Sequence, residues 1–324
     1  MGADDLYVRA TQTRGAVILM YHSVAGKDAA AWIDPANHLP PEVFERHLSY
    51  LNRHRKVVPL SNVLQALQRG DCLSAGTVSI TFDDGYLDTL STAAPLLARF
   101  SFPATVYLAT GYISRGQSQW IDQLYGAFVS RTQDDLDLGG AGGAVWNLGV
   151  TFDRSAAYAW LKQRLLTGNL ADRNALLAEV EGQLRPYGMP PRLTMTWDDV
   201  RTLRARYPAI ELGVHTRDHL DLTAHSNDVV AAELAGCIED FRVNLGFPPR
   251  HFSFPYSRAN RDLSRMLADV GLESAAIACE DPVVKAAADR YCLPRIAAPC
   301  STRLLGLVTS GAYPDLPRRL VGRA

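Results

Sequence analysis

The sequence predicts an α/β protein built as a (β/α) barrel, complete or one unit short, with seven to eight strands and a mainly helical insertion. Short apolar segments alternate along the chain with amphipathic helical segments, an order typical of a parallel sheet covered by helices. In such barrels, chemically active side chains gather at the carboxyl ends of the strands. Four polar features follow directly after predicted strands: His22, Asp83–Asp84, His215 with His219, and Tyr256.

The composition is that of a globular protein with a sizeable core. The chain has 324 residues, of which 47% are hydrophobic and 21% charged, and its net charge is −1. A charge so close to zero gives no reason to expect a nucleic acid or an anionic membrane as partner. The five cysteines are odd in number and show no CxxC spacing, which disfavours a disulfide framework and favours a reducing compartment.

The chain shows no targeting or membrane-spanning signal. Its first 14 residues are polar, without a basic segment followed by an apolar one, so no secretory signal peptide is visible. No apolar run approaches the roughly 18 residues that a transmembrane helix needs. We therefore expect a cytoplasmic protein, while a membrane-associated or exported substrate stays open. The oligomeric state is not predicted.

The first half of the barrel is predicted between Ala16 and residue 108. Ala16–His22 is a continuous apolar run that ends in a histidine, which indicates a strand buried on both faces. Pro41–His54 has proline in its first turn and apolar residues on one face, which indicates a helix. The same alternation continues with predicted strands at 57–60, 78–82 and 102–108 and predicted helices at 61–68 and 88–100.

Residues 112–195 interrupt this alternation. They contain three helical segments and the glycine-rich stretch 139–143, and prolines close them. We expect them to form an inserted helical cap on a single domain that spans residues 1–324, with a core from about 16 to 300. The alternation then resumes with predicted helices at 196–206, 227–245 and 261–270 and predicted strands at 210–214, 251–254, 274–279 and 291–296.

The stretch Thr81–Tyr86 places two adjacent carboxylates at the end of a buried strand. Adjacent like charges repel each other, and their burial is costly. A metal ion bound to one carboxylate would relieve that cost and leave the other as a free base. The other interpretation of these residues is a solvated Asp–Gly turn.

Asp84, His215 and His219 form a candidate metal site. Two imidazoles and a carboxylate suit Zn²⁺, and also Co²⁺, Ni²⁺, Mn²⁺ or Fe²⁺, without any thiolate. Three protein ligands leave positions open for water and substrate. The HxxxH pair alone fits a structural histidine pair equally well, and only the Asp–Asp strand end makes the metal interpretation specific.

Three segments resemble signature motifs of the polysaccharide deacetylases (carbohydrate esterase family 4, the NodB-homology domain). Thr81–Tyr86 and His215–His219 resemble the first two motifs, and Phe252–Ser257 resembles the third. The resemblance covers most of the chain from about residue 16 to 296, apart from the insertion. It implies a metal-dependent hydrolase that removes the N-acetyl group from an N-acetylhexosamine in a glycan or glycoconjugate.

The resemblance also implies roles for individual residues. Asp83 is implied as the general base that takes a proton from the attacking water. The backbone N–H of Tyr256 is implied as a donor to the oxyanion of the reaction. The implied metal ligands are Asp84, His215 and His219.

One departure from the family's pattern concerns the general acid. The region that carries an acid histidine in the best-known members reads Leu293–Ile296 here and holds none. However, Leu19–Val24 resembles the N-terminal motif of the poly-N-acetylglucosamine deacetylase branch, which implies His22 as the acid. The other interpretation of His22 is a core histidine.

A second departure concerns the residue that orients the base. The family's usual arginine in the third motif is Ser253 here. Arg295 on the last predicted strand replaces it if its guanidinium reaches Asp83. A structural role for Arg295 is the alternative.

Two other functions stay open. The first is a metal-dependent hydrolase of another amide, such as a formamido sugar or a small cyclic amide. The second is a non-catalytic sugar-binding barrel, which the intact set of candidate site residues argues against. Trp120 and Tyr125 in the insertion suit stacking on a sugar, although aromatic residues at this spacing are more often part of a core.

Overall fold

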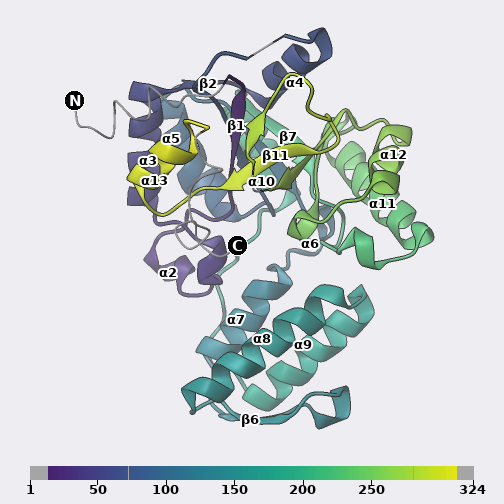
Figure 1. Cartoon of the computed structure of the whole chain (residues 1–324). Helices are drawn as coiled ribbons and strands as arrows, with labels where there is room; N and C mark the ends of the chain where they lie inside the picture. The colour runs from purple at the N-terminus through teal and green to yellow at the C-terminus, as the bar shows by residue number, and fades with distance from the viewer. Residues whose placement is uncertain (1–13, 72, 280, 312–324) are drawn as a thin grey trace.

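The computed structural model describes residues 14–71, 73–279 and 281–311, and within them seven parallel strands close into a barrel (Figure 1). The barrel closes because β1 pairs in parallel with both β11 and β3. The predicted barrel is therefore confirmed, in the form one unit short of eight. Around the barrel the strands are β1 (Ala16–Tyr21), β11 (Leu293–Ala297), β9 (Ser274–Ala278), β8 (His251–Ser253), β7 (Ile210–Val214), β4 (Ala104–Leu108) and β3 (Thr77–Phe82).

Two further strands extend the sheet at the amino-terminal end of the barrel. β2 (Lys56–Val57) pairs with the start of β3, and β10 (Val283–Val284) pairs antiparallel with the start of β1. The strand expected at 57–60 is thus misplaced by the sequence. Pro59 has no N–H for the ladder, and the chain turns there into helix α4, which starts at Leu60. β10 is too short to have a sequence signal.

Side chains at alternate positions of the strands pack into two different apolar clusters. Leu19 and Tyr21 belong to the large cluster that includes Phe44 of helix α3, whereas Ile18 packs with Tyr107 in another cluster. The central strands are buried along their whole length, as expected for a parallel sheet covered by helices. The covering helices are α3 (Pro41–His54), α4 (Leu60–Arg69), α5 (Ala94–Arg99), α10 (Trp197–Arg206), α11 (Asn227–Leu245), α12 (Arg261–Asp269) and α13 (Thr302–Val308).

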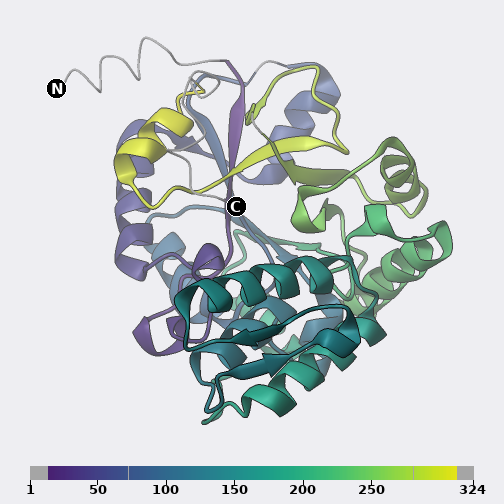
Figure 2. The same ribbon diagram turned by 60° about the horizontal axis from the view of Figure 1, so that its bottom comes forward.

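Between β4 and β7 the chain forms a separate lobe beside the barrel (Figures 1 and 2). The lobe has its own apolar core, which includes Leu124, Leu161 and Leu177. The sequence did not predict its two-stranded hairpin, in which the glycine-rich stretch forms the turn. Its elements, with the short helix that leads into it, are α6 (Thr110–Arg115), α7 (Trp120–Val129), β5 (Asp135–Asp137), β6 (Val145–Asn147), α8 (Thr151–Thr167) and α9 (Leu170–Leu184).

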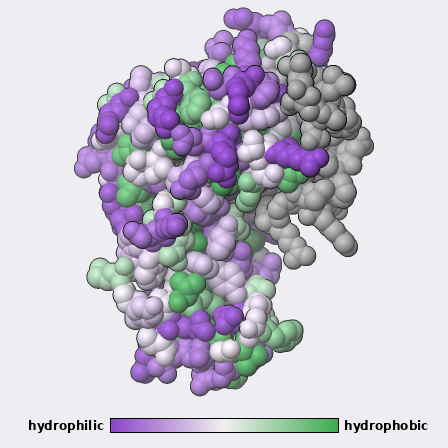
Figure 3. All heavy atoms as spheres, turned by 90° about the vertical axis from the view of Figure 1, so that its left-hand side faces the viewer, coloured by the Kyte–Doolittle hydropathy of each residue, from purple (hydrophilic) through white to green (hydrophobic). Residues whose placement is uncertain are grey.

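The loop after β1 contains the one-turn helix α2 (Lys27–Ala30) and a 3₁₀ turn at Pro35–Asn37. Among the described residues, no helix has both the length and the apolar composition to cross a membrane. The face in Figure 3 is mostly hydrophilic, with small separate hydrophobic patches. The polar stretch up to residue 13 and Cys72 lie outside the described residues.

Candidate metal centre

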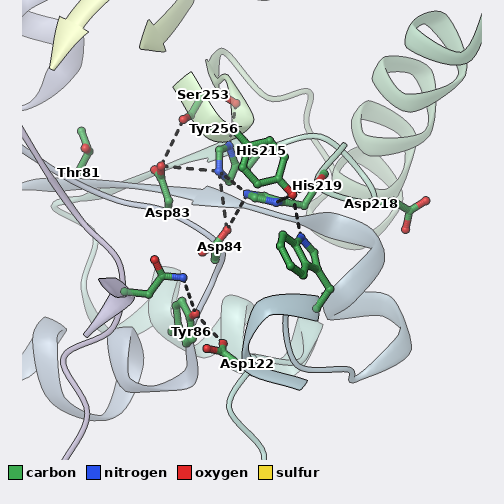
Figure 4. Close-up of polar contacts among 12 residues, drawn as sticks. Thr81, Asp83, Asp84, Tyr86, Asp122, His215, Asp218, His219, Ser253 and Tyr256 are labelled. Carbon is green, nitrogen blue, oxygen red and sulfur yellow. Dashed lines mark hydrogen bonds and ion pairs between the residues drawn. The ribbon is translucent and has the colours of Figure 1, made fainter. Parts of the chain in front are cut away.

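The ends of β3 and β7 bring three predicted metal ligands together (Figure 4). The Asp84 Oδ1 atom lies 3.3 Å from His219 Nε2 and 3.7 Å from His215 Nε2, and the two Nε2 atoms lie 3.2 Å apart. For bonds of about 2.0–2.1 Å, a tetrahedral zinc ion has ligand atoms roughly 3.3–3.4 Å apart. The three atoms therefore have the spacing that one small metal ion requires.

Hydrogen bonds at the other ring nitrogens fix which nitrogen of each histidine carries the proton. His215 Nδ1 lies 2.7 Å from the carbonyl oxygen of Ser253, which only accepts, so Nδ1 carries the proton. The Tyr256 hydroxyl donates its proton to the carbonyl oxygen of His219. Towards His219 Nδ1, 3.0 Å away, the hydroxyl must therefore accept, so this Nδ1 is also protonated. Both Nε2 atoms keep a free lone pair, as metal ligation requires.

Among the described residues, the one further polar group recorded near these ligand atoms is the Asp83 carboxylate, whose Oδ2 lies 3.6 Å from His215 Nε2. Burial lowers the pKa of both histidines, so both rings are neutral at pH 7 and their Nε2 lone pairs face each other. Asp84 Oδ1 is buried without a hydrogen bond to any described group. Burial, together with Asp83 and Asp122, raises the pKa of Asp84 well above its usual value. A divalent cation would satisfy these three atoms at once, and the donor set therefore fits such an ion.

Asp83 lies beside this set and is held by Arg295. The guanidinium donates from Nη1 to Oδ1 at 2.7 Å and from Nη2 to Oδ2 at 2.5 Å, and both side chains are almost fully buried. The condition set for Arg295 is thus met. Ser253, which stands where the family's arginine is expected, also donates to Asp83, at 3.4 Å. Burial alone raises the pKa of Asp83, but Arg295 and His215 outweigh it and hold that pKa below its usual range.

His22 follows β1 and is the neighbour of Asp83 in the barrel. Tyr21 pairs with Phe82, and the N–H of Asp83 donates to the carbonyl of Tyr21. The His22 side chain is partly exposed. Burial of the ring, assisted by Arg295 and His215 and opposed by Asp83, lowers the pKa of His22 to about 4. The residue is therefore close to the predicted base but neutral at pH 7 in the free protein.

Tyr256 takes part in the centre in a way that the sequence did not predict. Its phenol links to His219, as described above, and accepts a hydrogen bond from the indole N–H of Trp120 at 2.7 Å. Its backbone lies in the left-handed region, with φ of 54°, and its own N–H donates to no described residue. That N–H is free to serve the predicted role towards an oxyanion.

The loop that carries His215 and His219 is anchored from several sides. Thr216 and His219 both have positive φ, at 61° and 50°, a conformation that non-glycine residues keep only under external constraint. Glu233 on α11 accepts the N–H groups of Arg217 and Asp218. Asp218 is buried and paired with Arg115, which fits a residue that supports the loop behind the predicted ligands and not a solvated one.

Some features of the centre had no sequence signal. Trp120 is buried in the core of the lobe, the position that is more common for aromatic residues at its spacing. Its hydrogen bond to Tyr256 had no signal in the sequence. The anchoring role of Glu233 could not be predicted from a helical segment that looks amphipathic. Taken together, three clustered ligand atoms, an arginine-held carboxylate and an adjacent histidine can activate water and move protons.

Comparison with known proteins identifies related sequences. A family model described as "Polysaccharide deacetylase" matches residues 70–133 and 157–275, more than half of the chain. YxkH of Bacillus subtilis (strain 168), whose curated name provisionally calls it a polysaccharide deacetylase, is 29% identical over 131 residues. The aligned stretch covers 38% of this chain and 44% of that protein, so it spans less than half of the relative.

Two solved structures share the fold over almost the whole chain. IcaB from Ammonifex degensii matches with a TM-score of 0.60 and 17% identity, over 92% of this chain and 98% of that one. The Streptococcus pyogenes deacetylase PplD, in complex with acetate, matches with a TM-score of 0.58 and 17% identity, over 91% and 97% of the two chains. At these identities the likeness is one of fold.

Proposed function

The chain belongs to the polysaccharide deacetylase family, and from this premise we propose that it is a metal-dependent hydrolase that removes the N-acetyl group from an N-acetylhexosamine in a glycan or glycoconjugate. The observation that carries the proposal is the convergence of three ligand atoms from Asp84, His215 and His219 beside the arginine-held Asp83. The resemblance of the N-terminal motif around His22 supports the poly-N-acetylglucosamine deacetylase branch.

Asp84, His215 and His219 would hold the metal, for which Zn²⁺ is the first candidate and Co²⁺, Ni²⁺, Mn²⁺ and Fe²⁺ are compatible with the same donors. A bound divalent ion supplies Lewis acidity towards the acetamide carbonyl and lowers the pKa of water towards about 7. Tyr256 and the carbonyl of Ser253 hold the two histidine rings in the orientation that this binding needs.

The remaining steps belong to the protein's own residues. Asp83 takes a proton from the attacking water, and Arg295 fixes the direction of its carboxylate. The N–H of Tyr256 donates to the oxygen that gains charge as the carbonyl carbon becomes tetrahedral. The C–N bond then breaks, the sugar nitrogen leaves as an amine, and the acetyl group leaves as acetate.

His22 supplies the proton that the departing amine needs. Because its pKa is about 4 in the free protein, His22 starts neutral and must gain a proton during the reaction. Asp83 has just taken a proton from water and lies next to His22 at the strand ends. It is therefore the source of the proton that His22 gains. Protons then balance: one proton of the water arrives at the amine, and the other stays on the product as acetic acid, which ionises to acetate at neutral pH.

The test combines metal content with acetate release. We would load the purified protein with Zn²⁺, measure bound metal by mass spectrometry, and follow acetate release from N-acetylglucosamine oligomers. Wild type should bind about one ion and release acetate, because it holds both the ligands and the base. Asp83→Asn should keep the metal but release no acetate, and Asp84→Asn should lose the metal.

Asp262→Asn is the matched control, because this carboxylate is exposed on α12 and its recorded partner is the equally exposed Arg265. It should behave as wild type in both measurements. Metal bound without acetate release would redirect the search to other amides. Absence of metal binding in wild type would refute the proposed mechanism and favour a sugar-binding role.

A further inference from the structure

Arg173 is an unusual residue for the lobe that follows β4. It is only 1% exposed, although it lies in the first turns of α9. Burying a guanidinium is costly unless its donors are satisfied. Its described partners are backbone carbonyls, the Tyr112 hydroxyl and the ring of Trp120, whose centre lies 5.4 Å from the guanidinium carbon. No carboxylate is recorded as its partner among the described residues.

The carbonyls that Arg173 contacts belong to the metal-ligand loop. Nη1 donates to the carbonyl oxygen of Asp218 at 3.0 Å, and Nη1 and Nη2 each lie 3.4 Å from the carbonyl oxygen of His219. Nε donates to the carbonyl of Leu165 at the end of α8. One side chain therefore ties the inside of the lobe to the backbone of a predicted metal ligand.

These contacts act on a loop that needs constraint. Thr216 and His219 have positive φ, and such non-glycine conformations persist only when the surroundings determine them. Glu233 holds N–H groups of the loop from α11, while Arg173 holds carbonyl groups from α9. Glu233 and Arg173 bind different groups of the loop, so Glu233 cannot replace Arg173. When Arg173 is removed, the Tyr256 hydroxyl is the remaining described partner of the His219 carbonyl.

A second link joins the lobe to the same ligand. Trp120 of α7 donates to the Tyr256 hydroxyl, which in turn contacts both Nδ1 and the carbonyl of His219. Figure 4 shows Tyr256 beside His219. Two helices of the lobe thus reach one metal ligand by independent routes.

We propose that Arg173 is a positioning residue of the metal centre, which holds His219 in the backbone conformation that directs its Nε2 towards the ion. The lobe is then part of the metal site instead of a detachable cap. This inference rests on the proposed function, because it takes the metal centre as given. It predicts that tight metal binding depends on a contact made from the lobe.

The test measures the affinity for Zn²⁺ itself, by competition with a chromophoric chelator. Arg173→Met should raise the apparent Kd about 10- to 100-fold, the usual effect when a partner of a metal ligand is lost. Arg173→Lys keeps the charge but not the forked donor geometry, and should recover only part of the affinity. The visible absorption of the Co²⁺-loaded protein should also change in Arg173→Met, because the His219 ligand is no longer fixed.

Two control variants separate positioning from general destabilisation. Arg164→Met removes an exposed arginine of α8 and should leave both affinity and stability unchanged. Leu161→Ala removes a fully buried side chain from the core of the lobe and should lower the denaturant midpoint. It should still bind Zn²⁺ within twofold of wild type, because it leaves the hydrogen bonds that Arg173 and Trp120 make to the ligand loop and Tyr256 in place.

Two results would overturn the inference while the metal site itself stands: Arg173→Met binds Zn²⁺ within twofold of wild type, or Leu161→Ala weakens binding as much as Arg173→Met does. If wild type binds no Zn²⁺, the proposed function fails, and the inference fails with it. The affinity of wild type therefore distinguishes the two failures.

Discussion

Replacing Arg295 by methionine tests how the predicted base is held. Arg295 and Asp83 are 1% and 2% exposed and share two hydrogen bonds. Removal of one partner from a buried ion pair leaves the other charge buried and unpaired, which costs about 3–5 kcal/mol. We expect metal-free Arg295→Met to lose about this much free energy of unfolding at pH 7.

The loss should depend on pH with a definite sign. In wild type the pKa of Asp83 is lower in the folded protein than in the unfolded chain. The carboxylate therefore stabilises the fold at every pH above its pKa in the unfolded chain. This contribution is lost only as the pH falls towards its pKa in the folded protein. In the variant, burial is no longer opposed by Arg295 and raises the pKa of Asp83. The folded variant then keeps a proton that the unfolded chain releases above about pH 4. The deficit should therefore be smaller at pH 4.5 than at pH 7.

Urea denaturation in the presence of a chelator, at both pH values, measures these free energies. The double variant Arg295→Met with Asp83→Asn removes both charges, and we expect it to regain at least half of the stability lost at pH 7. A loss below about 1 kcal/mol at pH 7, or equal losses at the two pH values, would refute the reasoning. Either result would mean that the pair is not desolvated as the structure shows.

Two further predictions concern residues near the same strand ends. His47 is fully buried and its pKa is lowered to about 4, by burial first and then by Arg46, so the unfolded chain takes up a proton between about pH 6.5 and 4 that the folded protein does not. Wild type should therefore lose about 2 kcal/mol more than His47→Gln between pH 7 and pH 5 in urea denaturation, and equal losses would contradict this. Asp88→Ala removes the acceptor of the Ser23 hydroxyl and the Val24 N–H, directly after His22. It should cost about 1–3 kcal/mol of stability and lower kcat more than it raises KM, and an unchanged kcat would show that this anchoring does not matter to His22.

The barrel and the cluster of Asp84, His215 and His219 could be predicted because their signals are local. Ala16–Tyr21 and Thr77–Phe82 are apolar runs of strand length, and parallel strands place their carboxyl ends on one edge. Polar residues that follow such strands must therefore meet. The pairing of Asp83 with Arg295 could be stated only as a condition, because the sequence does not give the register between β3 and β11.

The supporting contacts could not be predicted because they join segments that are distant in sequence. Trp120 and Tyr256 lie 136 positions apart, and nothing around either residue indicates their hydrogen bond. Arg173 reads in sequence as a solvated charge on a helix, and only the packing of α8, α9 and the ligand loop shows that it is buried. The hairpin of the lobe has strands of three residues, too short for a recognisable alternation.

The positive φ angles have a consequence for how this protein can change. Of the seven described non-glycine residues with positive φ, five lie in or next to the three motifs. Substitutions that remove the backbone strain at such residues stabilise a fold. The same substitutions leave the side chains that depend on this backbone conformation less precisely positioned. Selection for thermal tolerance and selection for a fixed geometry of the site therefore act in opposite directions on the same positions: Asp84, Thr216, His219, Tyr256 and Ser257.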